Sequence, residues 1–186
     1  ANPNDVEIPY RYAQYLRAFP LATNRANLVR DADNLMDTML RRNESEANAY
    51  VNLYQYRQRF GLSNVDVDLE VALNTFPNDA RFVVFRAQRE ITEGKLEIAL
   101  GTYQQALEID PENRNAYLGL ASLYRRRDDH KQAQEVLQKG LKEIDSQDIL
   151  LRLELADVSI DLGDFESAGS TLKKLDQRLA LIAGNL

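Results

Sequence analysis

The sequence predicts an all-α protein in which pairs of helices stack as an α-α superhelix, a solenoid of helical hairpins. A pattern of small residues begins at Ala99, Ala133 and Ala168, at intervals of 34 and 35 residues. Each of these alanines is followed by a large residue at the fourth position and by a small or apolar residue at the seventh, namely Tyr103 and Ala106, Leu137 and Gly140, and Leu172 and Leu175. A period of this length is typical of repeats that bury a continuous core by stacking on their neighbours. Breaks at Gly61, Gly94 and Gly163 argue against a continuous coiled coil.

The segment 80–113 shows the two-helix design most clearly. Apolar residues recur at helical spacing up to Ile91, and Gly94 follows where a helix C-cap is expected. A second helix is predicted over 95–109, because the residue before Pro111 is disfavoured in the α region.

The other repeats are placed by the same signals. Turns are predicted at Asp128–Asp129, at 162–164 and at Gly61, and Pro20 limits the first helix to roughly residues 8–19. We expect one solenoid over residues 1–186 with about four to five repeats. The predicted repeats are 13–46, which is degenerate, 47–79, 80–113, 114–148 and 149–182.

Composition narrows the classes of function. The net charge of −6 disfavours general attraction to nucleic acid or to anionic membranes. The absence of cysteine excludes disulfides and cysteine-ligated metal sites. No apolar run reaches the roughly 18 residues of a transmembrane helix, so we expect no direct membrane insertion and a soluble protein, either cytoplasmic or periplasmic.

The sequence offers little for catalysis. His130 is the only histidine and follows two aspartates in a turn, where a solvated residue is the simplest interpretation. The acidic pairs near 31–33 and 66–70 lie at predicted helix starts and lack the pattern of a calcium loop. The basic run 125–127 is followed by two carboxylates that offset its field. We therefore predict no enzyme activity, no cofactor and no metal site.

The residues of the third and fourth complete repeats resemble the tetratricopeptide repeat family. Tyr117, Leu120, Ala121 and Tyr124 match the first-helix pattern of that family, and Ala133 and Leu137 match its second helix. Leu155, Ala156, Gly163, Phe165 and Ala168 provide a second, partial match. Arg86 and Glu90 depart from the family pattern, which has a leucine and a tyrosine at these places.

The resemblance implies that the first helix of each pair lines a concave groove that binds protein or peptide. In this groove Val51, Val84, Leu118 and Leu153 would form an apolar row, flanked by amide and hydroxyl side chains suited to a peptide backbone. The lysine and asparagine clamp that some family members use for a C-terminal carboxylate is missing at the matching places. The predicted groove residues are Asn48, Val51, Gln55, Arg81, Val84, Gln88, Asn115, Leu118, Ser122, Arg125, Leu150 and Leu153.

These observations favour a non-catalytic scaffold for protein–protein interaction. An alternative is the repeat region of a larger bacterial protein that serves envelope assembly or exopolysaccharide export. A small enzyme or nucleic-acid binder is a third class, which the missing motifs disfavour. The apolar residues of 149–162 and of the last helix, including Phe165, Leu172, Leu181 and Leu186, also predict an exposed edge that further repeats or a second copy of the chain would cover.

Overall fold

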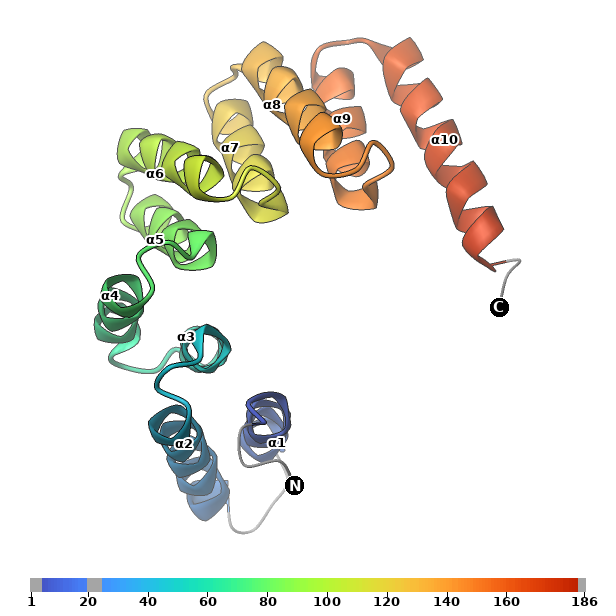
Figure 1. Cartoon of the computed structure of the whole chain (residues 1–186). Coiled ribbons are helices and arrows are strands. Elements are labelled where there is room, and N and C mark those ends of the chain that lie inside the picture. The colour runs from blue at the N-terminus through green and yellow to red at the C-terminus, as the bar shows by residue number, and fades with distance from the viewer. Residues whose placement is uncertain (1–4, 20–24, 184–186) are drawn as a thin grey trace. The chain divides into compact units, whose positions relative to one another are not determined.

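The computed structural model describes residues 5–19 and 25–183, with side chains described up to residue 176. Every regular element in this part of the chain is an α-helix, and the helices follow one another as hairpins (Figure 1). The chain divides into two compact units, Ala1–Phe82 and Val83–Leu186. The all-α fold of stacked hairpins is confirmed, whereas a single solenoid over the whole chain stays a prediction.

The first unit holds two helical hairpins. Its helices are α1 (Glu7–Ala18), α2 (Arg25–Arg42), α3 (Ala47–Arg59) and α4 (Val65–Thr75). Each helix packs on the next, and α1 also contacts α3. The first helices of successive repeats are therefore neighbours, as the solenoid design requires.

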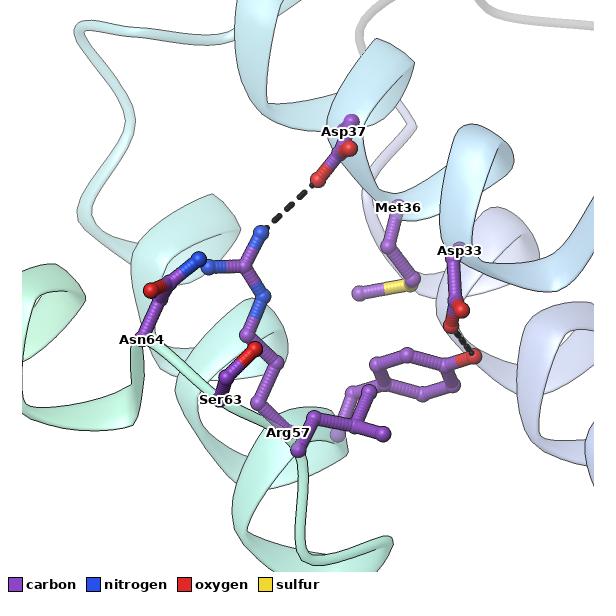
Figure 2. Close-up of a pocket in the computed structure, with 8 residues that line it drawn as sticks. Asp33, Met36, Asp37, Arg57, Ser63 and Asn64 are labelled. Carbon is purple, nitrogen blue, oxygen red and sulfur yellow. Dashed lines mark hydrogen bonds and ion pairs between the residues drawn. The ribbon is translucent and has the colours of Figure 1, made fainter. Parts of the chain in front are cut away.

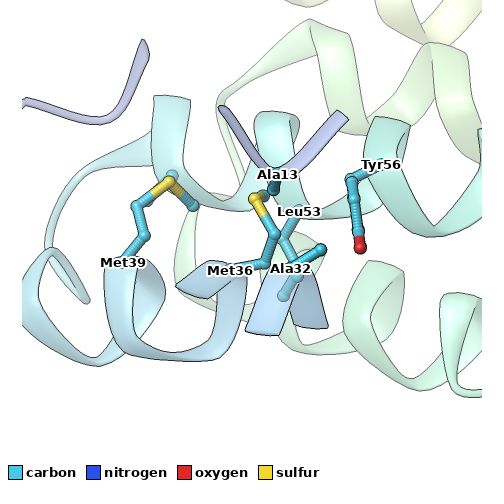
Figure 3. Close-up of a cluster of buried hydrophobic side chains, with 7 residues drawn as sticks. Ala13, Ala32, Met36, Met39, Leu53 and Tyr56 are labelled. Carbon is cyan, nitrogen blue, oxygen red and sulfur yellow. The ribbon is translucent and has the colours of Figure 1, made fainter. Parts of the chain in front are cut away.

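The core of the first unit shows why its first repeat folds despite a weak pattern (Figure 3). Ala13, Ala32 and Met36 are fully buried between α1, α2 and α3, together with Met39, Ala49, Leu53 and Tyr56. Alanine lets helix backbones approach closely, and the flexible methionine side chains fill the remaining space. The connection from α1 to α2 is longer than the three residues that separate α5 from α6. The helix α2 is also longer, with 18 residues against 11, 14 and 14 in α4, α6 and α8. As a result α1 begins 40 residues before α3 (Glu7 to Ala47), and the first repeat looks degenerate in sequence.

The second unit continues the same design. It contains most of α5 (Ala80–Thr92), then α6 (Leu96–Ile109), α7 (Arg114–Arg126), α8 (His130–Glu143), α9 (Ile149–Asp161) and α10 (Phe165–Ala183). From α6 onward each helix packs on the next, and α7 also contacts α9. These bounds agree with the predicted helices within a few residues.

Local signals set the ends of these helices. The side chain of Asn113 accepts a hydrogen bond from the backbone N–H of Ala116, and that of Asp148 accepts one from Leu151, each at 3.1 Å. These are N-caps, which satisfy backbone donors that have no partner within the helix. At the turn from α7 to α8, Asp128 has a φ of 58°, the left-handed conformation that Gly61, Gly94 and Gly163 have in three other hairpins.

The core of the second unit is built from α7, α8 and α9. Tyr117, Ala121, Ala133, Leu137, Leu151 and Val158 form one buried cluster. Ala133 and Leu137 are fully buried, which confirms the second-helix positions predicted from the repeat pattern.

The two departures from the family pattern give a polar contact between α5 and α6. The Nη2 of Arg86 donates to Gln105 Oε1 at 2.6 Å, and Arg86 Nε lies 3.9 Å from Glu90 Oε1. Burial, followed by the charge of Glu90, raises the pKa of the Tyr103 hydroxyl to about 12. An Arg86–Glu90 ion pair, with Arg86 also hydrogen-bonded to Gln105, thus replaces the expected leucine and tyrosine.

The predicted C-terminal edge is described only in part. Phe165 is 70% exposed and Leu172 is 43% exposed, whereas Ala168 and Leu175 are buried. Leu179, Leu181, Ile182 and Leu186 lie outside the residues whose side chains are described. Self-association through this edge stays a prediction.

Candidate functional site

The first helices α7 and α9 present the most open part of the predicted groove. Leu150 is 49% exposed and Leu153 is 42% exposed, one turn apart on α9. Ile160, further along α9, is 45% exposed. Because α7 and α9 are in contact, the exposed Asn115 and Ser122 of α7 belong to the neighbouring helix. Exposed apolar and polar groups therefore lie on two helices that pack together within the second unit.

A shallow depression lies between the C-terminal halves of α7 and α9. Ser122, Arg125, Arg126 and Asp161 line it, and its volume is about 300 Å³. Arg125 is fixed there, since its Nε donates to Asp161 Oδ2 at 2.8 Å and its Nη1 donates to Glu154 Oε2 at 3.3 Å. Arg126 is exposed and makes no ion pair within the described part of the chain.

Sequence reasoning missed the two acidic partners of Arg125. Glu154 and Asp161 lie seven residues apart on one face of α9. The sequence signal that could have found them is their distance from Arg125 along the chain. Glu154 and Asp161 follow Arg125 by 29 and 36 residues, each close to the length of one repeat. A basic residue and an acidic residue one repeat apart on first helices are placed side by side by the stacking itself.

Two residues of the predicted apolar row do not stand open to a partner. Val84 is 1% exposed, and its neighbours Phe82, Val83 and Ala87 on α5 are buried as well. Leu118 is half-buried and packs against the core cluster around Tyr117 and Leu137. Leu118 therefore belongs in part to the packing between helices and is less open than its place in the predicted apolar row suggests.

The predicted groove residues in the first unit are partly engaged within the protein. Asn48 Oδ1 accepts a hydrogen bond from Arg81 Nη1 at 2.6 Å, and Gln55 Oε1 accepts one from Tyr10 Oη at 3.2 Å. Val51 is half-buried beside them. These polar side chains stabilise the stacking of first helices and are less free for a peptide than the sequence suggested. Gln88, in the second unit, is half-buried.

Arg81 is also held by Asp79, the residue before α5. The carboxylate of Asp79 accepts hydrogen bonds from the backbone N–H of Arg81 at 3.1 Å and from its Nη2 at 2.6 Å. Burial alone would raise the pKa of Asp79, but these hydrogen bonds and the charge of Arg81 outweigh burial and lower it.

A second hollow, of about 180 Å³, lies in the first unit between α2, α3 and the start of α4 (Figure 2). Tyr56 Oη donates to Asp33 Oδ1 at 2.7 Å, and Arg57 Nη2 donates to Asp37 Oδ1 at 2.9 Å. Arg57 also donates to Asp68 on α4. Burial, then the hydrogen bond to Asp33, raises the pKa of Tyr56 well above its usual range. Since these polar and charged groups are already paired with one another, we interpret the residues around the hollow as contacts that hold the helices together.

His130 differs from its predicted solvated state. Its side chain is 25% exposed, with Nε2 3.8 Å from Asp128 and Nδ1 3.7 Å from Asp161. Over the described residues, no group of three or more histidine, aspartate or glutamate side chains could hold a metal ion. In the same part of the chain, no helix is long and apolar enough to cross a membrane.

Residues 90–148, which span most of the clearest repeats, match a family model described as tetratricopeptide repeat. The chain has the tetratricopeptide repeat fold. The resemblance inferred from Tyr117, Ala121 and Ala133 is therefore confirmed, and all three residues are buried in the contacts between helices.

Solved structures with the same fold cover nearly the whole chain. A thermophilic tetratricopeptide repeat protein of Thermus thermophilus, TTC0263, is 20% identical, with a TM-score of 0.65 over 92% of this chain and 90% of that one. MamA is 15% identical, with a TM-score of 0.62 over 96% and 94%. PilW, a type IV pilus biogenesis factor, is 17% identical, with a TM-score of 0.67 over 94% and 78%. No curated protein matches the sequence.

Proposed function

We propose that this protein is a non-catalytic scaffold that binds a peptide or protein segment along the first helices of its repeats, with α7 and α9 as the principal contact. The supporting observation is the pair Leu150 and Leu153, each more than 40% exposed on a first helix. A water-exposed pair of leucines on a helix that also borders a polar depression is typical of a surface that a partner covers.

The chemistry of this surface suits a peptide better than a small molecule. The apolar side chains of α9 can take one or two apolar residues of a partner, and Ser122 and Asn115 can hydrogen-bond its backbone. The depression beside them is shallow, with no enclosed wall to bury most of a small ligand. Arg126, which is exposed, provides a cation for an acidic group at one end of the surface.

A selection from a random peptide library displayed on phage tests this proposal. The selected peptide is then titrated against the purified protein by fluorescence anisotropy. We expect the Leu150→Asp/Leu153→Asp variant to weaken binding by at least about tenfold, because it places charge where apolar contact is needed. Ile98→Asp is the matched control, since Ile98 is 57% exposed on the second helix α6 of the same unit.

Two results would contradict the proposal. One is unchanged binding in the Leu150→Asp/Leu153→Asp variant with unchanged helical circular dichroism. The other is an equal loss in the Ile98→Asp control, which would place the contact on the second helices.

The alternative role is that of the repeat region of a larger bacterial protein for envelope assembly or exopolysaccharide export. PilW and MamA share the fold at 17% and 15% identity, which says nothing of a shared partner. Both roles require a protein-binding surface, so the selected peptide would indicate which kind of partner fits.

A further inference from the structure

The helix α1 carries an exposed apolar stripe that the proposed peptide surface does not use. Ile8 is 61% exposed, Tyr12 55%, Tyr15 59% and Phe19 44%. Their spacing of four, three and four residues places Ile8, Tyr12 and Tyr15 on one face of α1 and continues to Phe19, the C-cap residue that follows the helix. The rings of Tyr15 and Phe19 are 5.4 Å apart between centroids, so the stripe continues to the end of α1. We call these four residues the α1 stripe.

The contacts that α1 makes within its own unit lie on its other faces. Ala13 is fully buried in the core, and Tyr10 Oη donates to Gln55 on α3. Gln14 Oε1 accepts a hydrogen bond from Arg59 Nη1 at 2.7 Å. These contacts leave the α1 stripe between 44% and 61% exposed within the described part of the first unit.

We propose that the α1 stripe is a self-association surface, on which α1 of a second copy of this chain packs antiparallel. The first argument is symmetry. The spacing of four, three and four reads the same in both directions, so a two-fold axis between Tyr12 and Tyr15 places Ile8 against Phe19 and Tyr12 against Tyr15 of the other copy. A two-fold interface must be complementary to itself in this way.

Electrostatics favours the same arrangement. A surface that meets its own copy opposes like charges unless it is neutral, and the α1 stripe contains no charged residue. Beside it, Arg11 Nε pairs with Glu7 Oε1 at 2.6 Å, so this flank is neutral as well. Antiparallel packing also sets the positive end of one helix dipole beside the negative end of the other.

The size of the stripe sets the strength of the dimer. A fully covered aromatic side chain buries about 150–250 Å². Three aromatic residues near half exposure, together with Ile8, therefore expose roughly 400 Å² that a partner can cover. Two copies would bury about 800 Å² from the stripes alone, below the roughly 1,200 Å² of a stable complex. The dimer is therefore weak and depends on concentration.

Sedimentation equilibrium measures this association directly. We expect the mean mass of the wild type to rise above that of the monomer over roughly 10–500 μM, the range for an interface of this size. Tyr12→Glu/Tyr15→Glu should stay monomeric over the same range. Val67→Glu/Val71→Glu is the matched control, because Val67 and Val71 are 62% and 46% exposed on α4 of the same unit and outside the stripe.

Cysteine cross-linking tests the orientation, and the 186 residues contain no cysteine to interfere. In the antiparallel dimer, an equal mixture of Ile8→Cys and Phe19→Cys proteins should form disulfide-linked heterodimers under mild oxidation. Each variant alone should cross-link at least about fivefold less, because positions 8 and 19 lie about 16 Å apart along the helix, beyond the reach of a disulfide.

Each outcome decides the proposal. A concentration-dependent mass that Tyr12→Glu/Tyr15→Glu abolishes, with preferential cross-linking in the mixture, supports it. The proposal is overturned if the wild type stays monomeric, or if the Val67→Glu/Val71→Glu control loses the association as fully as Tyr12→Glu/Tyr15→Glu does. Cross-linking of Ile8→Cys with itself overturns it as well. The cross-linking experiment decides even if the glutamate variant misfolds. Peptide binding at α9 can fail or succeed independently.

Discussion

Gly119 on α7 offers a sharp test of how closely the helices of the second unit pack. A Cβ atom added at Gly119 would lie 2.2 Å from Cζ and 2.6 Å from Oη of Tyr103 on α6. Carbon atoms in contact are normally about 3.5–4.0 Å apart, so the ring or the helix would have to move by more than about 1 Å. Tyr103 is only 2% exposed, so its ring has little space to move into.

The expected cost follows from two opposing effects. Overpacking of this kind costs about 1–3 kcal/mol, and the severity of the contact places it at the upper end. Replacing glycine by alanine within a helix returns about 1 kcal/mol. We therefore expect Gly119→Ala to lower the free energy of unfolding by about 2 kcal/mol, and the melting temperature by about 4–8 °C.

Gly101 provides the matched control. It lies on α6, it is exposed, and a Cβ atom added there would meet nothing within 4 Å. Gly101→Ala should therefore raise the free energy of unfolding by about 0.5–1 kcal/mol.

Both glycine variants are measured by urea unfolding followed by circular dichroism. In a Tyr103→Leu background, which removes the end of the ring, Gly119→Ala should lose most of its penalty, a coupling that a double-mutant cycle reports. Equal stability of Gly119→Ala and Gly101→Ala, or a penalty that persists without the ring, would show that α6 and α7 are not packed as described.

Three further predictions follow from the packing and the charges. Ala133→Arg should cost more than about 3 kcal/mol and melt the second unit, because Ala133 is fully buried; a folded, stable variant by thermal denaturation would contradict the repeat alignment. Leu118→Asp should lower the free energy of unfolding by about 1–2 kcal/mol, since Leu118 packs on the core; unchanged stability in urea would instead restore it as a purely exposed groove residue. Asp79→Asn should destabilise the protein by less than about 1 kcal/mol at pH 7, because the partner Arg81 is partly exposed and screened. The folded pKa of Asp79 is below its ordinary value of 3.8, so its charge stabilises the fold above that pH, and this contribution disappears as the pH falls through the folded pKa. The difference between wild type and Asp79→Asn should therefore vanish in strong acid, and a difference independent of pH in urea titrations would contradict the pairing.

Much of the fold could be predicted from the sequence because it depends on local signals. Gly94 and Gly163 have φ values of 78° and 76°, which few other residues adopt, so their positions fixed two turns. Ala133 and Leu137 were identified as core residues because the repeat spacing places them where paired helices meet.

The first repeat and the details of the groove could not be predicted as well. The long helix α2, with 18 residues, breaks the repeat register, yet Ala13 and Met36 are still fully buried in one cluster. The repeat position of Val84 predicts a place on the first helix, but its burial depends on how neighbouring elements cover that helix. The pairing of Arg125 with Asp161 depends on side-chain contacts across repeats, which the pattern of one repeat does not contain.

The central claim, that the first helices α7 and α9 bind a peptide, is tested most directly by hydrogen exchange with and without the peptide selected from the library. The account predicts slower amide exchange in α7 and α9 when the peptide is bound, with little change in α6 and α8, because side chains on the first helices make the contact. Protection confined to α6 and α8 would contradict it.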